Sequence, residues 1–172
     1  METARFFLLI VLLLVAAYTD VAHRKIYNWL TFPIIGLGLG LAGGETVLND
    51  NWGHFMPIIL SLAISLVIYL IPFFLGWIGG GDLKLMVAIS CLQGASPFGA
   101  GFMMHSIFNI TLVGAVMAIL LLIWKGTLLK GVAGSFKLLV HPMANKEEEQ
   151  VLTIPYGIAI SIGTFLTIFN LL

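Results

Sequence analysis

Long apolar stretches dominate this sequence and restrict what the chain can fold into. A helix needs about 20 mostly apolar residues to cross a bilayer, and somewhat fewer where its ends adapt. Six stretches are candidates: Ala4–Thr19, Asn28–Leu41, Phe55–Leu75, Leu83–Leu92, Phe102–Trp124 and Leu152–Leu171. The fourth is short, and its helix is expected to start at Asp82. Only 9% of the 172 residues are charged, against about 25% in soluble domains. The sequence therefore predicts an all-α polytopic membrane protein with six transmembrane helices in a single domain, residues 1–172.

The basic residues gather in alternate loops and predict the orientation of the bundle. Lys and Arg lie next to the first, third and fifth connections, at Arg24, Lys25, Lys84, Lys125, Lys130, Lys137 and Lys146. Residues 43–54 and 94–101 contain none. Because cytoplasmic loops collect basic residues, we expect both termini outside and Asp20 and Asp82 at the cytoplasmic side, with Arg5 as the one exception. The same pattern favours a transmembrane helix over a signal peptide for the first stretch.

Two carboxylates stand apart from the other acidic residues because they border apolar stretches. The others are the terminal Glu2, Glu45 and Asp50 in an expected outer loop, and the charge run Glu147–Glu149. Asp20 and Asp82, on one side of a small bundle, can share a proton and activate a water, as in aspartic proteases. The dipoles of their own helices favour Asp82 as the base and Asp20 as the acid. The alternative is structural, with Asp20 capping the first loop and Asp82 acting as the N-cap of the fourth helix.

Three glycines, Gly79, Gly80 and Gly81, directly precede Asp82. Glycine allows a positive φ and a close approach of other groups, so this stretch predicts a turn that a substrate strand could approach.

Cys91 is the only cysteine, which excludes an internal disulfide and a multi-cysteine zinc site. The four histidines lack ligand spacing, so we expect no metal site. The zero net charge gives no reason to expect a nucleic-acid partner.

Three ordered motifs resemble those of the type IV prepilin peptidases. Thr19-Asp20, followed by a basic turn and Ile26-x-Asn28-Trp29-Leu30, resembles the first catalytic motif of that family. The stretch Gly79-Gly80-Gly81-Asp82-x-Lys84-Leu85 resembles the second, G-x-G-D, which is shared with the wider class of intramembrane aspartyl proteases. Ile154-Pro155-Tyr156-Gly157 resembles the third recurrent stretch. The resemblance covers about residues 15–165.

The resemblance implies a multi-pass aspartic endopeptidase in the inner (plasma) membrane of a prokaryote, with Asp20 and Asp82 as its catalytic pair. It would remove the basic leader from a prepilin or pseudopilin precursor at the cytoplasmic face, using water and no metal or other cofactor. Gly79, Gly80, Gly81, Lys84, Asn28, Pro155 and Tyr156 are further candidates for supporting or substrate-binding roles.

The start of the chain at the first helix and its single cysteine resemble a particular branch of the family. That branch is the short, peptidase-only one, such as the enzymes of tight-adherence (Flp-type) pili, without the N-terminal methyltransferase and CxxC region. Two other functions stay open: a proton- or cation-coupled transporter that uses the same two carboxylates, and a non-catalytic pilus assembly factor. The cognate pilin and the oligomeric state are open as well.

Overall fold

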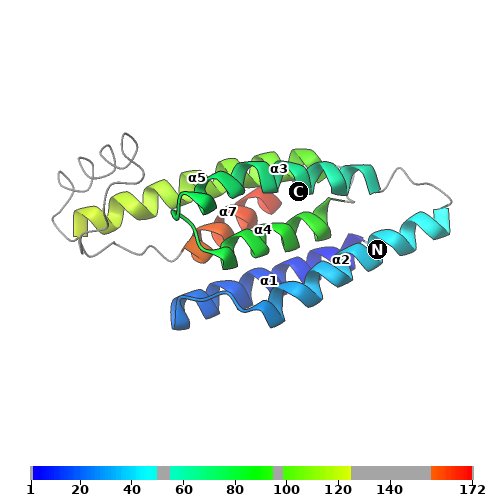
Figure 1. Ribbon diagram of the computed structural model, residues 1–172, viewed down its shortest axis with the longest axis horizontal. Coiled ribbons are helices and arrows are strands. Elements are labelled where there is room, and N and C mark those ends of the chain that lie inside the picture. Colours follow the sequence, from blue (N-terminus) through cyan, green and yellow to red (C-terminus); the bar gives the residue numbers. More distant parts are fainter. Residues whose placement is uncertain (1, 50–54, 95–98, 125–155, 172) are drawn as a thin grey trace.

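The computed structural model describes residues 2–49, 55–94, 99–124 and 156–171. Over these residues the chain forms a bundle of helices whose two termini lie toward the same end (Figure 1). The helices are α1 (Glu2–His23), α2 (Asn28–Asn49), α3 (Phe55–Phe74), α4 (Gly80–Gln93), α5 (Gly99–Trp124) and α7 (Tyr156–Leu171). The all-helical prediction is therefore confirmed for the described residues. The basic connection from Lys125 to Lys146 and the predicted start of the last stretch at Leu152 lie outside them.

The shortest helix, α4, lies at the centre of the bundle and contacts each of the other five described helices. It separates α1 and α2 from α3 and α5 (Figure 1). Every residue from Ala88 to Gln93 is buried. With 14 residues it extends about 21 Å, less than the roughly 30 Å of the hydrocarbon core. A short helix is tolerated here because protein rather than lipid surrounds it.

The polarity of the bundle is reversed relative to a soluble protein. Small hydroxyl residues are fully buried between the helices, among them Ser61, Ser65, Ser90 and Ser106, while large apolar side chains such as Phe7 and Phe108 point outward. Small polar residues at helix interfaces and an apolar exterior are typical of membrane bundles. Four helices are also long and apolar enough to cross a membrane, over Thr3–His23, Asn28–Leu48, Phe55–Phe74 and Gly99–Trp124. The protein is thus a multi-pass membrane protein.

Helix α2 differs from its predicted extent. The predicted stretch ends at Leu41, but the helix continues through Gly43 and Gly44 to Asn49. Inside a bilayer every backbone group needs a partner, so the helical hydrogen bonds outweigh the intrinsic cost of glycine. The extension also places Glu45 within the helix, so the expectation that it lies in a loop is wrong.

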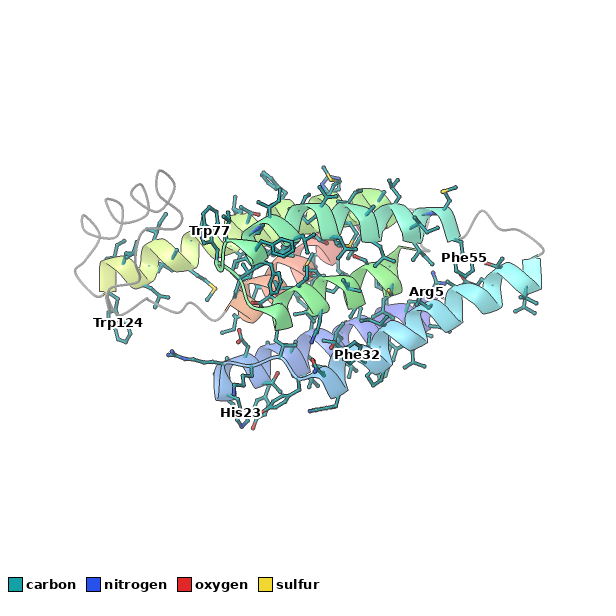
Figure 2. The ribbon with its side chains drawn as sticks, in the orientation of Figure 1. Arg5, His23, Phe32, Phe55, Trp77 and Trp124 are labelled. Carbon is teal, nitrogen blue, oxygen red and sulfur yellow. The ribbon has the colours of Figure 1, made fainter. Side chains whose placement is uncertain are left out.

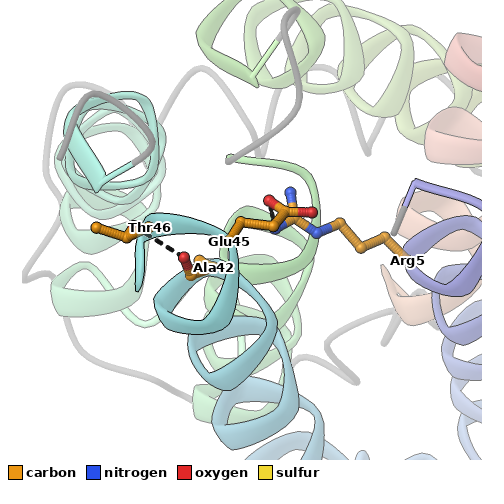
Figure 3. A network of polar contacts seen from close by, with 4 residues as sticks. All are labelled: Arg5, Ala42, Glu45 and Thr46. Carbon is orange, nitrogen blue, oxygen red and sulfur yellow. Dashed lines mark hydrogen bonds and ion pairs between the residues drawn. The ribbon is translucent and has the colours of Figure 1, made fainter. Parts of the chain in front are cut away.

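The extended part of α2 forms an ion pair with α1 at the end of the bundle near the termini. Arg5, only 2% exposed, places Nη2 2.5 Å from Oε2 of Glu45 (Figure 3). Thr46, on the next position of α2, donates its hydroxyl proton to the carbonyl of Ala42 at 2.9 Å. Arg5, the exception to the charge pattern, is therefore a neutralised, buried cation and not a loop residue.

Helix α4 begins two residues earlier than predicted. Gly79 is its N-cap and Asp82 occupies the third helical position, so Asp82 is not the N-cap that the structural alternative assigned to it. The Asp82 carboxylate nevertheless satisfies a backbone group at this end, because its Oδ2 accepts the N–H of Gly79 at 3.1 Å. An acidic side chain in the first turn is also favoured by the helix dipole.

Candidate active site

Asp20 lies in the last turn of α1 and is 6% exposed. Its Oδ2 completes no well-aligned hydrogen bond with the described residues. The carboxylate faces the backbone N–H groups of Gly157 and Ile158, at the beginning of α7. Considering α1 alone, we expected a dipole that disfavours negative charge at Asp20. The structure adds the N-terminus of α7, whose dipole acts in the opposite direction.

Asp82 lies in the first turn of α4 and is half-buried. It is outside the four candidate membrane spans. Burial raises the pKa of its carboxyl from 3.8 to about 6; the N–H of Gly79 opposes this rise and the negative charge of Asp20 adds to it. A group with this pKa is still mainly ionised at neutral pH, which is compatible with the predicted role as a base.

A cavity of about 370 Å³ contains both carboxylates. Its lining comes from the end of α1, the turn that leads into α2 and the beginning of α4: Asp20, Arg24, Lys25, Ile26, Tyr27, Asn28, Gly79, Gly81 and Asp82. The cavity is at the end of the bundle marked by His23, opposite the end marked by Arg5 (Figure 2). The structure thus brings the two predicted aspartates, far apart in sequence, to one site.

The turn between α1 and α2 supplies positive charge to this cavity. Arg24 has a φ of 52°, the one positive φ of a non-glycine residue in the described parts of the chain. Its N–H caps α1 by donating to the carbonyl of Asp20 at 2.9 Å. The positive charge of Arg24 acts on the Asp20 carboxylate, and an adjacent cation stabilises an ionised carboxyl.

The three glycines before Asp82 differ in what they contact. A Cβ atom on Gly81 would lie 3.1 Å from Cβ and 3.3 Å from the carbonyl oxygen of Ile26, so this glycine lets the α1–α2 turn pack directly on α4. A Cβ on Gly80 would make an ordinary 3.5 Å contact with Phe73, and one on Gly79 would lie 3.3 Å from Asp82 Oδ2. The close approach that we predicted is therefore made at Gly81 by the protein's own chain.

Lys84 points away from the carboxylates. Its ammonium group donates to Oδ1 of Asn28 at 2.9 Å and lies 5.4 Å from the centre of the Phe32 ring, and it does not line the cavity. Asn28 does line it; α2 starts at this residue, and its side-chain carbonyl oxygen accepts the hydrogen bond from Lys84.

Tyr156, at the first position of α7, lies close to Asp82 but does not line the cavity. Its hydroxyl lies near that of Tyr69 in α3, and both are close enough to Asp82 to feel its charge. Tyr69 is buried, and its hydroxyl makes no well-aligned hydrogen bond with the described residues. Pro155 lies outside the described residues. Two neighbours of the aspartates, Tyr69 and Gly157, were not predicted as site residues; Gly157 could have been found, since it completes the third motif.

Two carboxylates facing one cavity at the end of a membrane-embedded helical bundle define the general class: a multi-pass membrane protein with a paired-aspartate site. Comparison with known families gives a narrower assignment. The chain matches the type IV leader peptidase family over residues 7–139. It belongs to this family, as the resemblance of its motifs indicated.

Curated relatives agree with this membership. The chain is 36% identical over 83 residues to the prepilin peptidase EppA of Methanothermobacter thermautotrophicus, a match of 48% of this chain and 21% of the relative. It is 34% identical over 84 residues to the preflagellin peptidase of Methanococcus voltae, covering 46% of this chain and 34% of the relative. The matches therefore span at most about a third of these relatives. No solved structure matches the chain.

Proposed function

We propose that this protein is a prepilin-type leader peptidase, an intramembrane aspartic endopeptidase with Asp20 and Asp82 as its catalytic pair. The observation that carries the proposal is the single cavity that both carboxylates line. Membership of the type IV leader peptidase family supports the activity. The names of the two relatives support a pilin- or flagellin-like precursor as the substrate.

In the proposed mechanism a water between the two carboxylates attacks the scissile carbonyl. Asp82, ionised at neutral pH, accepts a proton from the attacking water while Asp20 donates its proton to the carbonyl oxygen. When the tetrahedral intermediate collapses, Asp82 passes the proton it took from water to the leaving amine, and the hydroxyl proton of the intermediate returns to Asp20. The N–H of Gly79 holds the Asp82 carboxylate at the beginning of α4. The cavity volume leaves room for an extended segment of the substrate beside the pair.

The proposed orientation places the cavity at the cytoplasmic face, with six membrane-crossing helices and both termini outside. Arg24 and Lys25 line the cavity and Lys84 lies beside it, so this end carries the basic residues. Arg5 at the opposite end is neutralised by Glu45 and does not weaken the charge bias. A basic leader would then remain in the cytoplasm while the apolar helix of the precursor stays in the bilayer.

A transporter that relays protons or cations finds less support. A relay needs ionisable groups at several depths across the membrane. In the described helices, no Asp, Glu, Lys or Arg lies between the Arg5–Glu45 pair at one end and the site residues at the other.

The proposal is tested by incubating the purified protein in liposomes with a precursor that has a basic leader and an apolar helix. We expect a shortened product whose new N-terminus, identified by mass spectrometry, lies at the junction between leader and helix. Intact precursor after incubation with a correctly folded protein would contradict the proposal.

The orientation has its own test. A Lys25→Cys variant should react with a membrane-impermeant maleimide in inverted vesicles and be protected in right-side-out cells. Cys91 is 1% exposed, so the background from the native cysteine should be low. Labelling in intact cells would reverse the proposed orientation.

A further inference from the structure

The first turn of α7 is packed against the Asp20 carboxyl more tightly than a side chain would allow. A Cβ atom on Gly157 would lie 2.8 Å from Oδ2, 3.0 Å from Cγ and 3.1 Å from Cβ of Asp20. A Cβ contact shorter than 3.0 Å is essentially never found in proteins, and the two longer contacts are tighter than nearly all real Cβ contacts. Any residue other than glycine at position 157 must therefore displace the carboxyl or move α7 away from α1.

A second contact fixes the position of α7 along α1. One turn after Gly157, the buried Ser161 places its hydroxyl 3.0 Å from the carbonyl of Leu13 and 2.8 Å from that of Gly157. A buried hydroxyl that bridges two helices resists sliding of one along the other. Gly157 is thereby held opposite Asp20, and not one turn above or below it.

The packing of Gly157 on Asp20 also brings backbone N–H groups of α7 to a carboxylate that has few other polar neighbours. Asp20 is 6% exposed and its Oδ2 has no well-aligned partner, while the N–H groups of Gly157 and Ile158 face it. The first N–H groups of a helix lack partners within the helix, and the dipole makes this end partly positive. Burial of a carboxyl side chain is otherwise unfavourable.

We propose that Gly157 is a positioning residue for catalysis, which lets the N-terminus of α7 hold the Asp20 carboxyl in its orientation toward Asp82. Gly157 does not line the cavity and acts through Asp20, against which it packs. This inference rests on the proposed peptidase function, which gives the orientation of Asp20 its importance. It differs from a packing role, in which glycine would only allow α7 to approach its neighbours.

Gly163, in the same helix, provides the matched control. A Cβ atom there would lie 2.5 Å from Cα of Ile110 in α5, so Gly163 is at least as intolerant of a side chain as Gly157, but none of its nearest neighbours is a site residue. Gly157→Ala and Gly163→Ala thus add the same methyl group to the same helix, against the site in one case and against α5 in the other.

The experiment measures kcat, KM and the melting temperature of wild type and both variants with a purified precursor. We expect Gly157→Ala to lower kcat about 100-fold, as a displacement of about 1 Å of a reacting group does, with KM nearly unchanged. Binding of uncleaved precursor, compared between Asp82→Asn and the double variant with Gly157→Ala, should be the same. Gly163→Ala should lower the melting temperature while the folded fraction keeps the wild-type kcat.

Ser161→Ala is a second variant that tests the same proposal if the Gly157→Ala protein does not fold. It adds no volume and loosens the alignment of α7 with α1, so kcat should fall at an unchanged KM. If the Gly157→Ala protein folds and keeps kcat within about twofold of wild type, or if kcat falls equally in Gly163→Ala, the positioning role is wrong. A wild-type protein that does not cleave the precursor would instead refute the proposed function itself.

Discussion

The ammonium group of Lys84 is hydrogen-bonded to Oδ1 of Asn28 at 2.9 Å, which joins the beginning of α4 to that of α2. The same group lies over the Phe32 ring, 5.4 Å from its centre. Lys84 belongs to the motif that contains Asp82, yet its side chain faces α2 and not the cavity. This contact indicates that the lysine aligns two helices, one of which carries Asp82, a member of the proposed catalytic pair.

Replacing Lys84 by methionine should therefore affect stability more than chemistry. The variant loses one charged hydrogen bond and one cation–π contact in a partly exposed position, together about 1–2 kcal/mol. We expect Lys84→Met to have a lower melting temperature than wild type and a kcat within about threefold of it. The melting temperature of Lys84→Arg should lie between those of the two proteins. A large loss of kcat in a fully stable protein would place the ammonium group at the reacting atoms.

Gly81 and Gly80 should respond differently to the same substitution. Gly81→Ala inserts a methyl group 3.1 Å from Ile26, and so should push the α1–α2 turn and its cavity-lining residues off α4. Gly80→Ala meets only an ordinary contact with Phe73 and gains helix propensity, about 1 kcal/mol in a helix interior. Cleavage assays should show reduced kcat/KM for the first variant and near-normal values for the second. Equal values for both would mean that the turn is free to adjust.

The Arg5–Glu45 pair should stabilise the bundle without affecting catalysis. Glu45→Gln leaves a guanidinium that is 2% exposed without its counter-charge, and breaking a buried pair in this way costs about 3–5 kcal/mol. The double variant Arg5→Met/Glu45→Gln should recover most of the loss, as measured by thermal unfolding in detergent. If the single variant is as stable as wild type, the guanidinium has another partner or is hydrated.

The raised pKa of Asp82 predicts a pH-dependent effect on stability. Because burial disfavours the ionised carboxyl, folding loses stability as the pH rises from 3.8 to about 6 and loses no more above that. Asp82→Asn removes this cost, so its stabilising effect should be complete near pH 8, on the order of 1–2 kcal/mol after solvent screening. The effect should disappear toward pH 4. Melting curves of both proteins across this range test it; destabilisation by the variant at high pH would contradict it.

The sequence was sufficient for those features that depend on local composition. Apolar stretches predicted the helices, and charge bias and elimination singled out Asp20 and Asp82. The differences concern helix ends: α2 passes through Gly43-Gly44, and α4 begins before Asp82 rather than at it. Helical hydrogen bonding inside the bilayer continues α2 through the two glycines, and Asp82 itself satisfies the N–H of Gly79 at the beginning of α4.

Contacts between distant helices were beyond the reach of sequence reasoning. The predicted acid role of Asp20 rests on the dipole of α1 alone, since nothing in the sequence near Asp20 indicates that α7 begins against it. The same applies to Tyr69, whose place behind Asp82 depends on how α3 packs on α4 and α7. Lys84 shares a motif with Asp82 but points elsewhere, because neighbouring positions on a helix face different directions.

The central claim, that Asp20 and Asp82 act as a catalytic pair, is tested most directly by single-turnover cleavage of a precursor by wild type, Asp20→Asn and Asp82→Asn. Asparagine keeps the size of the side chain but cannot exchange a proton, so each variant should lose activity by about 1,000-fold or more while remaining folded and keeping its affinity for uncleaved precursor. The double variant should be no slower than either single one, since the two groups act as a unit. Cleavage at a rate near that of wild type by either folded variant would contradict the paired-aspartate mechanism.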